Sequence, residues 1–139
     1  MQYKYKTSTP DETRSLAAQL AKKTAVGTVY GLTGGLGAGK TEFVRGFVAV
    51  LAPDTMVCSP SFTLVNTYRT DSFPIYHFDF YRLNDPDELI EIGYEEYITD
   101  YDAVVFIEWA DMFPDVLPEH TQFIHFKEVD RDHRIISVE

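Results

Sequence analysis

Cysteine and long apolar runs are nearly absent from this 139-residue chain. The single cysteine, Cys58, permits no disulfide within the chain, which excludes a disulfide-stapled secreted module. No apolar run approaches the roughly 20 residues of a membrane helix, and the opening stretch MQYKYKTSTP lacks the apolar core of a signal peptide. We therefore predict a cytoplasmic protein with no membrane partner. Because Cys58 lies between Val57 and Ser59, we expect a small packed residue rather than a reactive thiol.

Basic residues are also scarce. The chain has 12 Lys and Arg against 22 Asp and Glu, which gives a net charge of -10. A protein that binds nucleic acid by itself needs a basic surface, because phosphate neutralisation supplies most of the non-specific affinity. If the function concerns RNA, we expect another protein to hold that RNA.

The chain does contain enough apolar material for one globular domain over residues 1–139, since 45% of its residues are hydrophobic and 14% are aromatic. Its periodicity predicts an α/β fold with a mixed sheet, flanking helices and antiparallel hairpins. The expected elements are an edge strand at 3–6, a helix at 10–24 capped by Thr9, a strand at 28–33, a helix at 40–51, paired strands at 62–68 and 75–80, a helix entered at Asp85 and interrupted at Gly93, a strand buried on both faces at 103–107, and a hairpin of 121–127 with 133–138.

Residues 34–41, GGLGAGKT, fit the phosphate-binding motif G-x-x-x-x-G-K-[ST] at every fixed position. Glycines let backbone N–H groups ring a phosphate, and the following helix directs its positive end at the same anion. We expect Lys40 to face solvent and bridge the β- and γ-phosphates, and Thr41 to bind Mg²⁺. The alternative is a glycine-rich turn without a ligand. The predicted nucleotide contacts are Gly35, Leu36, Gly37, Ala38, Gly39, Lys40, Thr41 and Glu42.

The nucleotide is predicted to be ATP, because the chain lacks the N-K-x-D run with which GTP-binding proteins read guanine. Small-molecule kinases also carry this loop, but they usually close an arginine-rich lid over the phosphates. Here the arginines are scattered along the chain.

Glu108 is the predicted second ligand for Mg²⁺. It ends the apolar run 103–107, and the ends of buried strands are where open α/β sheets bind ligands. The alternative is an ordinary strand-terminal carboxylate that faces water. Trp109 follows, and it either packs or reports on the nucleotide.

The segment 77–81, HFDFY, places His77, Asp79 and Tyr81 on one face if it is a strand. Beside a nucleotide, a histidine and an acid could hold Mg²⁺ or orient the attacking water. The alternative is the polar outer face of an edge strand, and both interpretations stay open at this point.

Several motifs occur in the order known from one family. They are TPDET from Thr9, LGAGKT at 36–41, FVRGF at 43–47, SPSFTLVNTY at 59–68, HFDFYRL at 77–83 and IEW at 107–109. The chain resembles the bacterial TsaE (YjeE) family, the P-loop ATPase of tRNA threonylcarbamoyladenosine biosynthesis. The phosphate loop alone is generic, whereas SPSFTLVN followed by HFDFYR is specific, and the motifs span nearly the whole chain. The implied fold is the P-loop NTPase-like mixed sheet.

The resemblance also implies roles for single residues. Lys40 and Thr41 match the loop lysine and the metal-binding threonine, and Glu108 matches the second metal ligand. Asp79 matches the acid of a switch segment needed for ATPase activity, so the implied catalytic residues are Asp79, Glu108 and Lys40. Asp11 and Arg131 fall where the family contacts the rest of the nucleotide. Among the departures, Gly35 stands where the family often has Asp or Asn, and Ser61 replaces a Thr.

The family's activity implies an ATPase that is slow alone and depends on partners. Its members do not transfer the threonylcarbamoyl group. They dock on the threonylcarbamoyl transferase and its inactive-protease-like partner, so tRNA is met only indirectly, which agrees with the net charge of -10. Arg82 is the nearest internal candidate to reach the γ-phosphate. The alternatives are a small-molecule P-loop kinase and a nucleotide-sensing adaptor.

Overall fold

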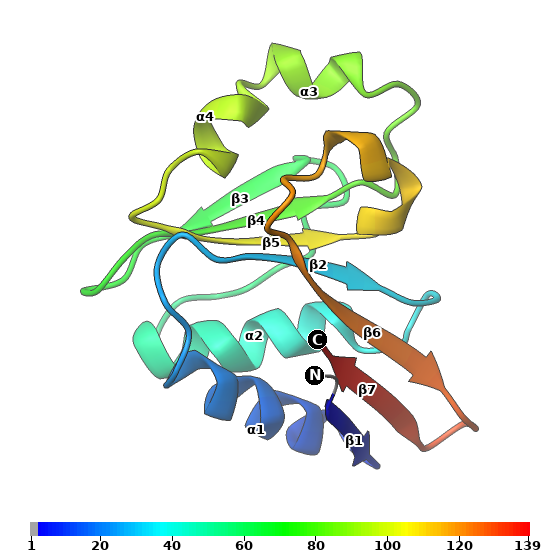
Figure 1. Ribbon diagram of the computed structural model, residues 1–139. Coiled ribbons are helices and arrows are strands. Elements are labelled where there is room, and N and C mark those ends of the chain that lie inside the picture. The colour runs from blue at the N-terminus through cyan, green and yellow to red at the C-terminus, as the bar shows by residue number, and fades with distance from the viewer. Residues whose placement is uncertain (1–2) are drawn as a thin grey trace.

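A seven-stranded sheet runs through the computed structural model, which describes residues 3–139; Met1 and Gln2 of the predicted domain lie outside the described residues. The strand order is β1-β7-β6-β2-β5-β4-β3 (Figure 1). The strands are β1 (Tyr3–Thr7), β2 (Val29–Thr33), β3 (Val65–Tyr68), β4 (Ile75–Asp79), β5 (Val104–Glu108), β6 (Gln122–Glu128) and β7 (Arg134–Val138). The helices are α1 (Pro10–Ala21), α2 (Lys40–Leu51), α3 (Asp87–Glu91) and α4 (Tyr94–Ile98), with 3₁₀ turns at Ala110–Met112 and Pro114–Val116.

The sheet is mixed, as predicted. Strands β6, β2, β5 and β4 pair in parallel, whereas β1 with β7, β7 with β6, and β3 with β4 pair antiparallel. In the parallel register, Glu108 lies opposite Leu32 on one side and Asp79 on the other. The carboxyl ends of β2, β5 and β4 therefore meet at one edge of the sheet, next to the loop that leaves β2.

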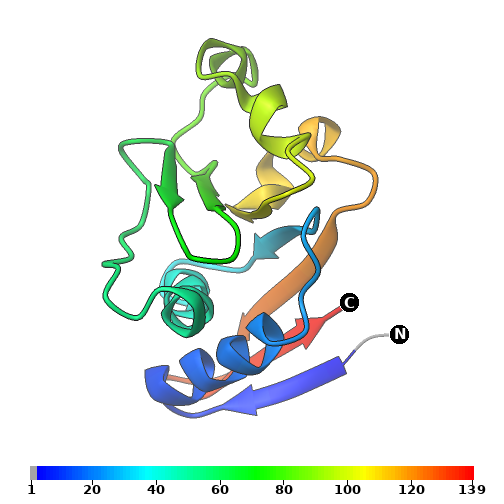
Figure 2. The same cartoon turned by 90° about the vertical axis from the view of Figure 1, so that its left-hand side faces the viewer.

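Helices cover both faces of the sheet. Figure 1 and Figure 2 show α1 and α2 side by side on one face, and α3 and α4 over the other. On the first face Phe47 packs edge-on against Phe106 of β5, with 4.8 Å between ring centroids. On the second face Phe78 of β4 contacts Tyr94 of α4 in the same way at 5.3 Å. Both faces of β5 are covered, so all of its residues are buried.

The caps of the helices follow local sequence. Thr9 accepts a hydrogen bond from the Glu12 backbone N–H at 3.1 Å, and Pro10 opens α1 at a position where no N–H is needed. The helix ends at Ala21, three residues before its predicted end. Gly93, with φ of 75°, separates α3 from α4 as predicted. The bounds of α2 are those predicted from its apolar periodicity.

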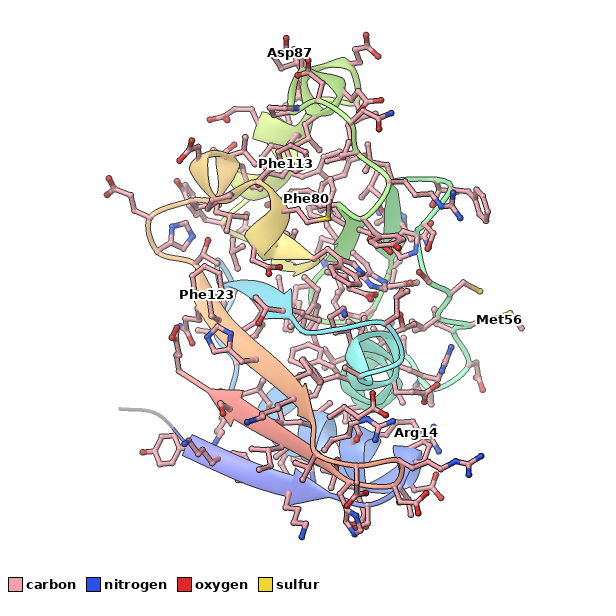
Figure 3. All side chains as sticks on the ribbon, turned by 90° about the vertical axis from the view of Figure 1, so that its right-hand side faces the viewer. Arg14, Met56, Phe80, Asp87, Phe113 and Phe123 are labelled. Carbon is pink, nitrogen blue, oxygen red and sulfur yellow. The ribbon has the colours of Figure 1, made fainter. Side chains whose placement is uncertain are left out.

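The segment before β3 corrects two predictions. The strand begins at Val65 rather than at residue 62, because the chain turns before it and Leu64 has a φ of 70°. Cys58 lies on the preceding irregular segment and is exposed, so the prediction of a packed cysteine was wrong. Nearby Met56 is 82% exposed and points away from the body of the molecule (Figure 3). Its apolar neighbour Val57 is buried on the same irregular segment, so burial there changes from one residue to the next and the flank of Cys58 did not indicate its own burial.

Candidate functional site

The glycine loop joins β2 to α2 and depends on backbone conformations that favour glycine. Gly34, Gly37 and Gly39 have φ values of 140°, 74° and 105°. A Cβ atom on Gly34 would lie 2.5 Å from the Phe126 carbonyl oxygen, so no side chain fits there. Gly39 caps α2 without a side-chain hydrogen bond. The first N–H groups of α2 thus have no side-chain cap, and a helix end of this kind is suited to bind an anion.

Lys40 is buried, which corrects the prediction that it faces solvent. The side chain folds back over its own loop and is only 5% exposed. Its Nζ donates to the carbonyl oxygens of Gly34 at 2.6 Å and Gly35 at 2.9 Å, and it lies 4.0 Å from the centroid of the Trp109 ring. Burial lowers the pKa of Lys40, and the nearby carboxylates Glu108 and Asp79 oppose that shift.

Glu108 and Thr41 are in direct contact. The Thr41 hydroxyl donates to both carboxylate oxygens of Glu108, at 3.1 Å and 2.9 Å. Glu108 is 3% exposed, so it does not face water as an ordinary strand-terminal acid would. Its Oε2 also lies 2.6 Å from Nε2 of His77, which is fully buried on β4. A hydroxyl and a carboxylate, both hard oxygen ligands, therefore meet at the first turn of α2.

Asp79 ends β4 beside Glu108 and is also buried. Its Oδ2 accepts hydrogen bonds from the hydroxyls of Ser59 and Ser61, each at 3.3 Å, and its Oδ1 accepts from the Tyr81 backbone N–H at 2.8 Å. Since β3 lies outside β4, the interpretation of this segment as an edge strand was wrong. Asp79 instead fastens the 59–61 segment to the carboxyl edge of the sheet.

Two cavities lie on either side of the loop. The first has a volume of about 250 Å³ and is lined by Leu36, Gly37, Ala38, Gly39, Lys40, Thr41, Glu42, Ser59, Ser61, Asp79, Tyr81, Glu108 and Trp109. The second has a volume of about 270 Å³ and is lined by Ser8, Thr9, Pro10, Thr13, Gly37, Ala38, Gly39, Glu42, Arg131, Asp132 and Arg134. The cavities share the wall formed by 37–39 and Glu42. One extended ligand could therefore contact both sides of the loop.

The structure does not bring all of the predicted residues to these cavities. Asp11 lies at the surface, where it pairs with Arg14, and it lines neither cavity. Arg82 stacks over the exposed Phe62 ring, 4.4 Å from its centroid, and also lies outside both linings. Gly35 is absent from both linings, although its backbone oxygen holds Lys40.

Sequence reasoning missed other residues of the site. Arg134 lines the second cavity and donates to the Gly37 carbonyl oxygen at 3.2 Å. Ser59 and Ser61 reach Asp79, yet their motif was recognised without a role being assigned to either serine. The signal for these two was the presence of hydroxyls in a specific motif. For Arg134 there was none, because it sits at the start of an ordinary strand.

The residues present fit Mg²⁺ held jointly with a phosphate. Within residues 3–139 no group of three or more His, Cys, Asp and Glu side chains could enclose a metal by itself. Mg²⁺ usually needs no such cage, because it binds one or two carboxylates, several waters and the substrate's phosphates. Thr41 and Glu108 supply the hydroxyl and the carboxylate that this arrangement requires.

In the described part of the chain, no helix has the length and apolar character needed to cross a membrane.

Comparisons with known proteins agree with the motifs. Residues 7–136 match the family described as "Threonylcarbamoyl adenosine biosynthesis protein TsaE". The tRNA threonylcarbamoyladenosine biosynthesis protein TsaE of Bacillus subtilis is 37% identical over 136 residues, which cover 98% of this chain and 84% of that protein. The Rickettsia felis protein of the same name is 35% identical over 129 residues, covering 92% of this chain and 74% of the relative.

A solved structure agrees as well. The crystal structure of Bacillus subtilis YdiB superposes with a TM-score of 0.82 at 33% identity, covering 99% of this chain and 84% of that one. This likeness confirms the predicted P-loop fold class, and the family match confirms the resemblance seen in the motifs. The chain therefore belongs to the TsaE family of threonylcarbamoyl adenosine biosynthesis proteins.

Proposed function

We propose that this chain binds ATP with Mg²⁺ at the glycine loop and hydrolyses it in support of tRNA threonylcarbamoyladenosine biosynthesis. The observation that carries the proposal is the convergence of Lys40, Thr41 and Glu108 at the carboxyl edge of the sheet, around one cavity. The names of the relatives place those proteins in this pathway. The chemistry of the site supplies the nucleotide part of the proposal.

Lys40 would change partners when a nucleotide binds. Its ammonium now rests on the carbonyls of Gly34 and Gly35, which are neutral acceptors. Phosphate oxygens carry negative charge, so they attract the ammonium as an ion pair in addition to accepting its hydrogen bonds, which neutral carbonyls do not. We therefore infer that the loop holds Lys40 close to its binding position and releases it to the β- and γ-phosphates.

Thr41, Glu108 and Asp79 would divide the remaining work. Thr41 and Glu108 would hold Mg²⁺, which when bound neutralises charge on the phosphates. Asp79 would orient the attacking water, because its carboxylate lines the same cavity and is fixed by three hydrogen bonds. Two of these hydrogen bonds, from Ser59 and Ser61, also make Asp79 sensitive to the position of the 59–61 segment, as a switch residue must be.

The second cavity would take the nucleoside. Arg131 and Arg134 line it together with Thr9, the N-cap of α1, and Thr13 of that helix. It shares residues 37–39 with the first cavity. The predicted contact of Asp11 with the nucleotide would require its ion pair with Arg14 to open first.

Hydrolysis by the isolated chain should be slow. Of the described residues that line the first cavity, Lys40 is the only cation. An added arginine is worth about 10³–10⁵ in rate in P-loop enzymes. We propose that the threonylcarbamoyl transferase and its inactive-protease-like partner raise the rate, either by supplying a cation or by ordering the segment around Asp79. tRNA would then be met only through that pair.

The test is phosphate release from ATP by the chain alone, with the transferase pair, and with the pair plus tRNA. We expect a low basal rate that the pair stimulates. Glu108→Gln should lower the rate of Mg-dependent hydrolysis at least about tenfold. Its effect on nucleotide affinity measured without Mg²⁺ should be smaller. Asp79→Ala should lose most of the stimulated rate and keep ATP binding. A fast rate that ignores the pair, or ADP release that requires a small-molecule acceptor, would instead indicate an independent enzyme or a kinase.

A further inference from the structure

His77 is a fully buried histidine whose two ring nitrogens both have polar partners. Its Nε2 lies 2.6 Å from Glu108 Oε2, and its Nδ1 lies 2.9 Å from the Tyr68 hydroxyl. It lines neither of the two cavities. The proposed hydrolysis therefore gives it no direct contact with the nucleotide, although it touches one of the two metal-binding side chains.

The proton on Nε2 follows from the chemistry of the partners. An ionised carboxylate only accepts hydrogen bonds, so the contact with Glu108 requires an N–H on Nε2. The Tyr68 hydroxyl has one proton, which it can give to His77 Nδ1 or to the Cys58 carbonyl oxygen 3.1 Å away. That carbonyl also accepts from the Asn66 amide at 3.1 Å, so it keeps a partner in either case. When Tyr68 gives its proton to Nδ1, the ring is fixed with Nε2–H pointing at Glu108. When that proton goes to Cys58, Nδ1 must itself carry a proton to bond the Tyr68 oxygen, and Nε2–H again points at Glu108.

The rotation of the Glu108 carboxylate about its last bond depends on its hydrogen-bond partners. Its other contact is the Thr41 hydroxyl, which spans both carboxylate oxygens at 3.1 Å and 2.9 Å and so does not select one rotation of the group. The short contact to Oε2 does select one. It assigns Oε2 to His77 and leaves Oε1 with the Thr41 hydroxyl as its side-chain partner among the described residues.

We propose that His77, held by Tyr68, is a positioning residue that sets the Glu108 carboxylate for Mg²⁺. The inference rests on the proposed function, because it concerns the metal of that same site. Partners that orient a metal ligand are typically worth about 10–100-fold in metal affinity, so the effect should be measurable. The three residues come from β3, β4 and β5, which are adjacent strands, so the sheet itself holds the array in place.

The experiment compares two amides that each replace one ring nitrogen. The His77→Gln amide nitrogen reaches about as far as Nε2 and keeps a donor toward Glu108, whereas His77→Asn reaches only as far as Nδ1 and loses it. The affinity of a non-hydrolysable ATP analogue is measured by calorimetry with Mg²⁺ and with EDTA. We expect His77→Asn to lose about 10–100-fold of the Mg²⁺-dependent gain, and His77→Gln to keep most of that gain. Affinity in EDTA should stay within about threefold in both variants, because His77 lines neither cavity.

Tyr68→Phe is the second variant, and it decides the matter if His77→Asn does not fold. It keeps the ring and removes one hydroxyl, so it should lose several-fold of the Mg²⁺ gain with unchanged affinity in EDTA. A wild-type Mg²⁺ gain in both His77→Asn and Tyr68→Phe would overturn the inference, as would equal weakening with and without Mg²⁺, which would indicate a purely structural role. The wild-type measurement tests the proposed function separately from this inference. If the wild-type chain gains no affinity from Mg²⁺, the proposed function fails and this inference fails with it. If the wild-type chain gains affinity and the variants keep that gain, only this inference fails.

Discussion

Gly46→Ala should destabilise the fold, although alanine is the better helix former. Gly46 lies within α2 and faces α1. A Cβ atom there would lie 2.3 Å from the Arg14 carbonyl oxygen and 2.5 Å from the Arg14 Cα. These are backbone atoms of a packed helix, so no flexible side chain can turn aside. The glycine of the FVRGF motif is thus explained by the contact between two helices.

The size of the effect follows from two opposing contributions. Real Cβ contacts essentially never fall below 3.0 Å, so α1 must move by at least 0.7 Å from the present 2.3 Å. Overpacking of this kind costs about 1–3 kcal/mol, and a clash with backbone belongs at the upper end. Replacing glycine by alanine within a helix returns about 1 kcal/mol. The net loss is about 2 kcal/mol, which corresponds to a fall in melting temperature of roughly 6–10 °C for a chain of this size.

Thermal unfolding followed by circular dichroism measures this difference. Gly35→Ala is the matched control, because no atom lies within 4 Å of a Cβ placed at Gly35 and its stability should stay within about 1 kcal/mol of wild type. ATP binding by the Gly46 variant should also weaken, since Thr9 and Thr13 of the displaced segment line the second cavity. A Gly46→Ala protein that melts at or above the wild-type temperature would refute the reasoning.

Two further predictions concern Lys40 and Tyr76. Lys40→Ala should lower ATP affinity and turnover severely. It should change the melting temperature little, because burial already works against the charge of Lys40 and lowers its pKa. Calorimetry, an ATPase assay and a melting curve measure these effects, and a folded variant with normal binding and turnover would contradict the proposed role. The hydrogen bond to Asp100 raises the pKa of Tyr76 to about 12 from 10.0, so its neutral form stabilises the fold below pH 10 and that contribution is lost as the pH rises toward 12. Tyr76→Phe should therefore lose less free energy of unfolding than wild type between pH 9 and 11 in urea titrations, and parallel pH curves for the two proteins would show this account to be wrong.

Much of the fold could be predicted from the sequence because the signals are local. Helix α2 has its predicted bounds, since apolar spacing and the glycine before it are read within a few residues. The buried strand β5 and the hairpin of β6 with β7 followed from a continuous apolar run and from a turn around Asp130. The glycine loop could be recognised without any structure, because its function depends on residue types at fixed spacing.

The tertiary structure decided which of these residues meet and how deeply they are buried. His77 and Glu108 are 31 residues apart and touch only because β4 and β5 pair in parallel in one register. Arg134 reaches Gly37 across 97 residues through the order of the strands. The burial of Lys40 depends on the ring of Trp109 and on loop carbonyls that turn inward, and the exposure of Cys58 depends on where β3 begins. Periodicity within a segment carries no information on strand register or on contacts between distant segments, so the sequence by itself could identify the loop and its neighbouring acids but not the hydrogen-bonded array that joins them.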